Sequence, residues 1–233
     1  MKFGQFTYPV ASTRPILIFG LGELARLACT YFSEDSPHQV AGFIVDPEFA
    51  TEEGRYLNQP VYSSSAIGTS ITPQEFDIFV AFSGQQLSYP RSNKVRELLD
   101  KGFTLPSYVS SYAFIASDAI IGNNVMIFEH NTIQSEVTIG DSTILWSGNH
   151  IGHQTSIGEG VFISSHVCIG GRTKVENNCY FGMNSTVRDQ VTIGENTVVG
   201  SNSYVHRDFA GNAVIFGVPA KVLPGSDPMK AVN

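Results

Sequence analysis

The sequence predicts a two-part fold: a small Rossmann-like α/β domain with a parallel sheet, followed by an all-β left-handed parallel β-helix. Strands and helices alternate in the first part of the chain. A strict period of six residues then begins at Ile115, and no insertion interrupts it before Val205. We expect the α/β domain over residues 1–108 and the β-helix, with a C-terminal tail, over residues 109–233.

The α/β domain is predicted from short apolar runs that alternate with segments of helical periodicity. Gly102 follows the last of these segments, as glycine commonly does at the end of a helix. Such alternation is typical of a small parallel sheet covered by helices. The expected strands are 16–19, 40–45 and 76–82, and the expected helices are 23–32 and 91–101.

The β-helix is predicted from its period. Every sixth residue from Ile115 to Val205 is large and apolar, the next residue is often glycine, and the fourth after it is usually small or β-branched. A half-buried strand has a period of two and a helix one of about 3.6, so neither explains a sustained six. A triangular coil does, because each hexad forms one side, its large residue points to the axis, and glycine permits the bend.

Composition excludes several classes of protein. A formal net charge of −7 without a basic cluster argues against nucleic-acid binding. Cys29, Cys168 and Cys179 are scattered and form no CxxC pair, so we expect neither a disulfide framework nor a thiolate zinc site. The N-terminus lacks a signal-type apolar run, and no stretch of ~18 apolar residues occurs, so we expect a cytoplasmic protein without membrane insertion.

The chain resembles the hexapeptide-repeat sugar acyltransferases of the NeuD/PglD-like family, which are sialic acid O-acetyltransferases and nucleotide-amino-sugar N-acetyltransferases. The likeness covers nearly the whole chain. It rests on the opening IFGLGELA, the hexad array, the segment LWSGNHIGH at 145–153 and the closing GVPAK at 217–221. The resemblance implies a homotrimer, a nucleotide-sugar acceptor held by the N-terminal domain, and acetyl-CoA as acyl donor in a cleft between subunits, with no metal. It implies acetyl-CoA contacts at Gly171, Phe162, Met183, Ser201 and Lys221.

Two histidines are candidates for the chemistry. Acetyl transfer from a thioester to an amine or hydroxyl needs a base for the acceptor's proton, and histidine is the natural base near neutral pH. His150 and His153 both occupy outward positions of their hexads, so neither fills the core. The resemblance, aligned through residues 179–185, places His153 at the family's catalytic histidine. His150 is then the alternative base and a candidate substrate-binding residue.

The neighbours of His153 in the register are also informative. Gly171 follows it by eighteen residues, which is one full coil, and would leave room for a thioester carbonyl near its N–H; alternatively, it only turns a corner. In the family an acidic residue after the histidine orients the imidazole, whereas this chain has Gln154. Glutamine can hold a tautomer but does not stabilise an imidazolium as a carboxylate does.

A second candidate site lies in the α/β domain. The segment from Gly20 through Gly22 and Glu23 fits a loose G-x-G-x-x-A turn, whose amides and helix N-terminus could face a diphosphate. The same turn would suit NAD, with Asp46 on the ribose, but the sheet is short for that fold. Asp46 and Ser83 follow strands at the edge where such sheets bind ligands, although both could instead cap turns. All five are expected to bind substrate.

The expected function is acetyl transfer from acetyl-CoA to the amine of a nucleotide-linked amino-deoxy sugar made for surface polysaccharide. O-acetylation of a sugar is the runner-up. A zinc hydratase of the γ-carbonic-anhydrase type is a remote alternative, because His130 and His166 share a face, but the position for a further histidine is Gly171. A non-catalytic assembly protein is the remaining alternative.

Overall fold

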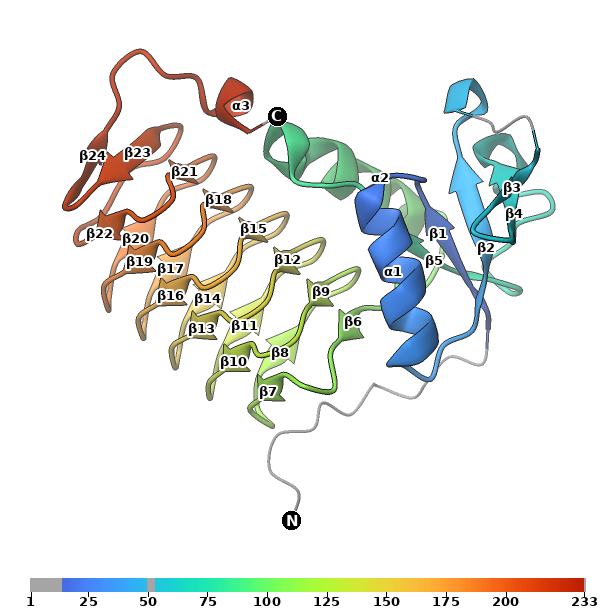
Figure 1. Ribbon diagram of the computed structural model, residues 1–233, viewed down its shortest axis with the longest axis horizontal. Coiled ribbons are helices and arrows are strands. Elements are labelled where there is room, and N and C mark those ends of the chain that lie inside the picture. Colours follow the sequence, from blue (N-terminus) through green and yellow to red (C-terminus); the bar gives the residue numbers. More distant parts are fainter. Residues whose placement is uncertain (1–13, 50–52, 233) are drawn as a thin grey trace.

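The computed structural model describes residues 14–49 and 53–232, which form a front domain packed against a long stack of coils (Figure 1). The predicted fold class is confirmed: an α/β domain is followed by a left-handed parallel β-helix. The chain passes from one to the other through β6 (Tyr108–Val109), which pairs with the first coil. No helix in the described ranges is both long and apolar enough to cross a membrane.

The front domain contains a five-stranded sheet of order β3-β4-β2-β1-β5. Its strands are β1 (Ile16–Phe19), β2 (Val40–Val45), β3 (Arg55–Tyr56), β4 (Gln59–Ser63) and β5 (Asp77–Val80). The sheet, expected to be parallel, is mixed, because β3 at one edge runs antiparallel to β4. Leu57 and Asn58 connect them with φ values of 48° and 62°, as a tight two-residue hairpin requires.

Helices cover both faces of this sheet. Helix α1 (Glu23–Glu34) lays Leu24, Ala25, Ala28 and Phe32 on one face, and α2 (Tyr89–Asp100) packs Val95 and Leu98 on the other. Helix α2 begins two residues earlier than expected, with Pro90 in its first turn, where proline is tolerated. Short 3₁₀ turns lie at Pro47–Phe49, Ser64–Ala66 and Gln85–Ser88, and α3 (Pro228–Ala231) lies near the C-terminus.

The β-helix has three sheets, one along each side of its coils. The six-stranded sheet contains β7 (Phe114–Ile115), β10 (Thr132–Ile133), β13 (His150–Ile151), β16 (Cys168–Ile169), β19 (Thr186–Val187) and β22 (Tyr204–Val205). The five-stranded sheet contains β8 (Ile120–Ile121), β11 (Thr138–Ile139), β14 (Ser156–Ile157), β17 (Lys174–Val175) and β20 (Thr192–Ile193). The eight-stranded sheet contains β6, β9 (Met126–Ile127), β12 (Ile144–Leu145), β15 (Phe162–Ile163), β18 (Tyr180–Phe181), β21 (Val198–Val199), β23 (Val214–Gly217) and β24 (Ala220–Val222).

The sixth-residue positions form the core, as predicted. Ile133 pairs in register with Ile115 and Ile151, so residues eighteen apart lie on successive coils. All of these sixth residues are buried except Ile121, which is partly covered because β8 ends its sheet. The axis of the β-helix is therefore a continuous apolar column.

Glycine has a different role from the one expected at the bends. The glycines that follow the large residues mostly have ordinary φ angles, and the left-handed conformation falls two residues later, as at Gln154 with φ 58°. A Cβ on Gly152 would lie 2.5 Å from the nitrogen of Gly171 in the next coil. These glycines are needed because successive coils approach closely, rather than for their φ.

The front domain packs against one corner of the triangle, which we call the docking corner: the turns between the five-stranded and eight-stranded sheets. The Asn124 side chain exchanges two hydrogen bonds, of 2.7 and 3.1 Å, with the backbone of Val80 at the end of β5. The Tyr89 hydroxyl at the start of α2 donates to Asn196 Oδ1 over 2.9 Å. A Cβ on Gly160 would lie 2.5 Å from Ser92 Oγ, so α2 follows this corner closely.

The eight-stranded sheet adds an apolar contact with the front domain. Trp146 is half-buried: its ring stacks on Phe128 at 4.7 Å, and both residues belong to the apolar cluster beneath α1. Asp35 at the end of α1 accepts hydrogen bonds from the Tyr108 hydroxyl at 2.6 Å and the Ser111 N–H at 2.9 Å. The two parts are thus joined by polar and apolar contacts.

Candidate functional site

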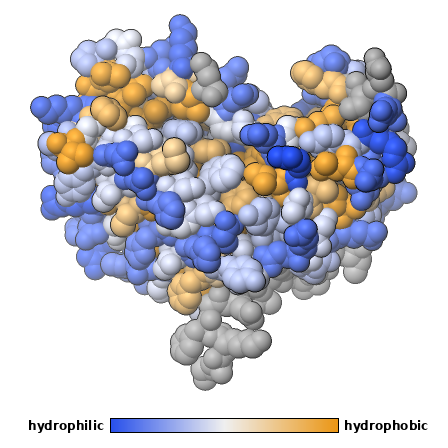
Figure 2. Space-filling model, viewed as in Figure 1, coloured by the Kyte–Doolittle hydropathy of each residue, from blue (hydrophilic) through white to orange (hydrophobic). Residues whose placement is uncertain are grey.

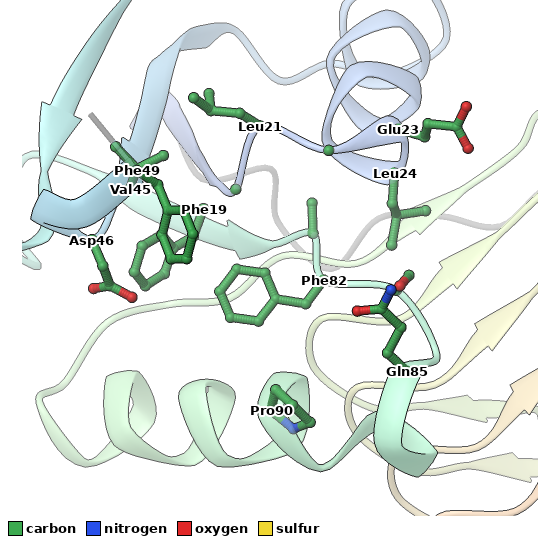
Figure 3. A pocket seen from close by; sticks show the side chains of 14 residues that line it. Phe19, Leu21, Glu23, Leu24, Val45, Asp46, Phe49, Phe82, Gln85 and Pro90 are labelled. Carbon is green, nitrogen blue, oxygen red and sulfur yellow. The ribbon is translucent and has the colours of Figure 1, made fainter. Parts of the chain in front are cut away.

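The carboxyl ends of β1, β2 and β5 and the first turn of α1 surround a pocket of about 560 Å³ (Figure 3). The five substrate-binding residues expected in the front domain all line it: Gly20, Gly22, Glu23, Asp46 and Ser83. Parallel strands end at one edge of the sheet, and this edge is where such sheets bind ligands. The structure therefore brings together residues that are far apart in the sequence.

The two glycines of the turn have different roles. Gly20 has φ +123°, a conformation that few other residues adopt, so the turn itself requires glycine there. Gly22 has φ −74° and caps α1 without a side-chain hydrogen bond. A Cβ on Gly22 would meet no atom within 4 Å. Gly22 therefore leaves the helix N-terminus open to the pocket, and the free amides of a helix N-terminus favour an anion.

The acidic residues at the pocket differ in how they are held. The carboxylate of Asp46 accepts a hydrogen bond of 2.5 Å from Ser64 Oγ, and its backbone carbonyl accepts one from Phe49. Asp46 thus also stabilises a turn, which was the alternative explanation for it. Glu23 is exposed, and its carboxylate is turned away from the other labelled side chains in Figure 3.

Aromatic rings form much of the pocket's apolar wall. Phe19, Phe49 and Phe82 all line it, and the rings of Phe19 and Phe82 lie 5.4 Å apart in a tilted arrangement. No lysine or arginine is among the described lining residues. Such a pocket suits a flat ring with polar substituents, while the open helix N-terminus beside it suits a negatively charged group.

His153 lies far from this pocket, on the corner between the six-stranded and five-stranded sheets, which we call the His153 corner. Its side chain is exposed, as its outward hexad position predicts. Its ring lies against Gly171 of the next coil, because a Cβ on Gly171 would come within 2.5 Å of Cε1 of the imidazole. The backbone N–H of His153 donates to Gln134 Oε1 over 2.9 Å.

The backbone N–H of Gly171, which we expected to be free to meet a thioester carbonyl, already donates a hydrogen bond within the chain. It donates to Asp189 Oδ1, one coil further on, over 2.9 Å. The expectation that this N–H meets a thioester carbonyl therefore does not hold in this geometry. Gly171 instead provides a flat surface on which the imidazole of His153 rests, and its contact with acetyl-CoA stays a prediction.

Gln154 is held away from the imidazole. Its amide nitrogen donates to the Glu136 carboxylate over 3.2 Å, and its amide oxygen accepts from Arg172 Nε over 3.1 Å. The three side chains form a ladder along the His153 corner at positions eighteen residues apart. Among the residues the structure describes, none hydrogen-bonds with the imidazole of His153 through a side chain, so Gln154 does not orient it in the single chain.

The residues expected to contact acetyl-CoA do not share one surface of the chain. Phe162 stacks on Tyr180 at 5.2 Å and packs against the front domain. Met183 and Ser201 are exposed on the third corner, between the eight-stranded and six-stranded sheets, and Lys221 is exposed on β24. His150 is half-buried on β13 between Thr132 and Cys168.

The histidines of the zinc alternative lie on that same third corner. His166 lies close to Gly148 of the preceding coil, and His130 lies 6.4 Å from the ring of Tyr112. Among the described residues, no group of three or more His, Cys, Asp or Glu side chains is arranged to hold a metal ion. Zinc hydration therefore gains no support from the geometry of one chain.

Sequence reasoning missed several residues around both parts of the site. Glu136, Arg172 and Asp189 could have been found by adding or subtracting eighteen from the numbers of Gln154 and Gly171. Arg91 could not, because a single arginine in a helical pattern usually indicates an exposed position. It is instead fully buried behind the pocket wall formed by Phe82.

The two groups of candidate residues lie on different sides of the molecule. The pocket belongs to the front domain, which packs on the docking corner and the eight-stranded sheet. The His153 corner joins the other two sheets and is the corner opposite the eight-stranded one. A single chain therefore keeps its pocket and His153 apart.

Comparison with known proteins agrees with this architecture. A family model described as the GMPPB C-terminal domain matches residues 103–215, somewhat less than half of the chain. A mutant of perosamine N-acetyltransferase from Caulobacter crescentus, in complex with CoA and GDP-perosamine, is similar with a TM-score of 0.80 and 23% identity. That match covers 91% of this chain and 98% of the other. No curated protein sequence matches the chain.

Two further solved structures are similar over the same share of the chain. The acetyltransferase domain of PglB from Neisseria gonorrhoeae FA1090 has a TM-score of 0.80 with 21% identity. WeeI from Acinetobacter baumannii AYE has a TM-score of 0.76 with 20% identity. Each match covers 91% of this chain and 100% of the other. The chain is thus a β-helix protein with an α/β front domain, and it shares this whole fold with those proteins.

Proposed function

We propose that this protein is an acetyl-CoA-dependent acetyltransferase that N-acetylates a nucleotide-linked amino-deoxy sugar in surface polysaccharide biosynthesis. The observation that carries the proposal is His153, an exposed imidazole resting on Gly171 at a coil corner, in a chain that also has a ligand pocket at the strand ends. The similar structures support it, since the perosamine enzyme is an N-acetyltransferase in complex with CoA and GDP-perosamine, and the PglB domain is in complex with acetyl coenzyme A.

In this proposal the front pocket binds the nucleotide, and His153 acts first as the general base and then as the general acid. Acetyl-CoA supplies the acetyl group as a thioester. His153 takes a proton from the acceptor amine as its nitrogen attacks the thioester carbonyl, and a carbon–nitrogen bond forms. His153 then returns a proton to the sulfur as the carbon–sulfur bond breaks. The products are the acetamido sugar and free CoA thiol, and no other reactant is needed.

The proposal includes assembly into a homotrimer, because one chain separates its pocket from its own His153. A neighbouring chain that presents the His153 corner to the pocket would complete the site. Exposed apolar side chains on the coils favour such contact: Ile120 is 65% exposed and Met183 57%. The use of acetyl-CoA is consistent with a cytoplasmic enzyme.

The direct test is to incubate the protein with acetyl-CoA and a panel of nucleotide amino sugars and to follow release of free thiol. We expect thiol release with at least one acceptor and an N-acetylated product by mass spectrometry. An ester-linked product would identify the runner-up, sugar O-acetylation. No thiol release with any acceptor, together with no thermal shift on adding acetyl-CoA, would favour the non-catalytic assembly protein instead.

A further inference from the structure

Arg91 lies in the first turn of α2, directly after the pocket residue Pro90, and is 0% exposed. Its Nη1 donates to the carbonyls of Phe82 and Ser83 over 2.7 and 2.8 Å. Both of these residues line the pocket. Figure 3 shows Phe82 at the centre of the pocket, with Gln85 beside it and Pro90 below it. The guanidinium is therefore bonded to the back of the pocket wall.

The other side of the guanidinium reaches two further segments. Nε donates to the carbonyl of Ser142, on the docking corner of the β-helix, over 2.9 Å. Nη2 donates to Ser88 Oγ over 2.9 Å. One planar side chain thus joins the pocket wall, the start of α2 and a coil of the β-helix, and only arginine has donors arranged to do this.

The segment that Arg91 holds is strained. Gln86, Leu87 and Ser88 are consecutive residues in the left-handed region, with φ values of 48°, 50° and 64°. Such a conformation persists only where surrounding contacts fix it, and it is common near ligand sites. Gly84 lies so close to the β-helix that a Cβ there would come within 2.7 Å of the Phe162 ring. The wall therefore has no room to shift toward the coils.

The charge of Arg91 is not neutralised by an acid. All of its hydrogen-bond acceptors are neutral oxygens, and none of the ion pairs among the described residues includes it. Burial lowers the pKa of Arg91 to about 9, which leaves it charged at neutral pH. Burying a charge without an acidic partner costs stability. Arg91 lies behind the pocket wall; no lysine or arginine is among the described lining residues, although Lys94 Nζ lies 5.1 Å from the ring of the lining residue Phe19.

We propose that Arg91 is a positioning residue for the acceptor: it fixes the Phe82–Ser88 wall, and its charge makes the pocket favour a ligand with phosphate groups. The inference deepens the proposed function and rests on it for the identity of the acceptor. Arg91 itself does not touch the ligand, because the wall lies between them.

The test is Arg91→Lys, which keeps the charge but replaces the fork by a single ammonium that cannot hold three segments together. We expect KM for the nucleotide sugar to rise about tenfold while kcat and KM for acetyl-CoA change less than about twofold. Isothermal calorimetry with UDP, GDP and inorganic pyrophosphate should show a matching loss of affinity for whichever of them the wild type binds. Arg96→Lys, at an exposed position on the same helix, is the matched control and should change neither quantity.

Ser88→Ala is the second variant, in case Arg91→Lys does not fold. It removes one acceptor of Arg91 and leaves the charge, so we expect a smaller rise in acceptor KM, of about two- to fivefold. A lower melting temperature with unchanged acceptor KM and unchanged affinity in calorimetry would assign Arg91 a purely structural role. If wild-type protein bound none of the three probes, the inference would be overturned, whereas binding without any acetyl transfer would overturn the proposed function alone.

Discussion

At the scale of single residues, the contact between His153 and Gly171 explains why the corner needs a glycine one coil below the histidine. The imidazole occupies the space that a Cβ at position 171 would fill. The ring is exposed, and the neighbouring side chains of Gln134 and Asp189 accept hydrogen bonds from backbone N–H groups and not from the ring. The imidazole nitrogens are therefore accessible to the substrate that accepts the acetyl group. His153→Asn tests the catalytic base, and Gly22→Val tests the acceptor pocket.

We expect His153→Asn to lower kcat by about 10²–10⁴-fold, the usual cost of removing a positioned general base. Steady-state kinetics measures it, and acetyl-CoA binding and assembly should persist because the side chain is exposed and contributes little to the core. His150→Asn should have a much smaller effect. A larger loss for His150→Asn than for His153→Asn would make His150 the base.

A double-mutant cycle serves as the control for this prediction. Gly171→Ala should also lower kcat, because the new methyl group displaces the ring of His153. If that is its only effect, the double variant His153→Asn with Gly171→Ala should be no slower than His153→Asn alone. Additive losses would show that Gly171 has a function of its own, such as contact with the acyl donor.

We expect Gly22→Val to raise KM for the nucleotide sugar and to leave KM for acetyl-CoA unchanged. The variant should fold, since Gly22 has φ −74° and a Cβ there meets no atom within 4 Å, but its side chain enters the pocket beside the helix N-terminus. Gly20→Val should instead destabilise the fold, because φ is +123° there. An unchanged acceptor KM in folded Gly22→Val would give the turn a purely structural role.

At the scale of elements, the coils were predictable because their signal is repeated. Each large residue from Ile115 onward adds to the same period, and pairing at eighteen residues follows from it. The hairpin of β3 and β4 was not predictable, since it has no alternating pattern and depends on two left-handed residues, Leu57 and Asn58. Elements with many equivalent residues are thus easier to predict than a single tight turn.

The same difference applies to the site. The pocket residues were predictable because strand ends of an α/β sheet converge, so Asp46 and Ser83 could be placed beside Gly22. The surroundings of Arg91 were not, because its acceptors come from three segments whose contact depends on how the front domain packs on the coils. Packing between domains leaves no local pattern in the sequence.

One contact between elements should make stability depend on pH. Burial alone would raise the pKa of Asp35, but hydrogen bonds from Ser111, Tyr108 and Ser110 outweigh it, and the pKa is lowered from 3.8. The folded state therefore releases this proton more readily than the unfolded state. The contribution to stability is present above pH 3.8 and is lost as the pH falls through the lower folded-state value.

We therefore expect Asp35→Asn to reduce the free energy of unfolding at pH 7 by about 1 kcal/mol, a small value because the carboxylate is only partly buried. Urea unfolding measured between pH 7 and 3 should show this difference shrinking once the pH falls below about 4. A difference that stayed constant over the whole range would mean that packing at this junction matters and the charge does not.

At the scale of the whole molecule, the separation of the pocket from His153 predicts complementation between a chain without its base and a chain with a weakened pocket. In a mixed assembly, the intact pocket of a His153→Asn chain can meet the intact His153 of a Gly22→Val chain. Random mixing in equal amounts would restore about a quarter of the sites if each site uses two neighbouring chains. Thiol release by the co-expressed pair, compared with each variant alone at an acceptor concentration well below the KM of Gly22→Val, measures this recovery. No recovery would mean that both parts of the site come from one chain.

The C-terminal strands determine where the stack of coils ends. Figure 2 shows apolar side chains gathered over this region, where Phe216, Val218, Val222 and Leu223 are exposed. The strands of the eight-stranded sheet are parallel as far as β23, and β24 then turns back antiparallel to it. A parallel coil with a free edge can pair with the coil of another molecule, which is how cross-β filaments grow. Because β24 runs in the reverse direction, the hairpin ends the parallel repeat of this sheet, and a further coil added there could not continue the parallel pairing.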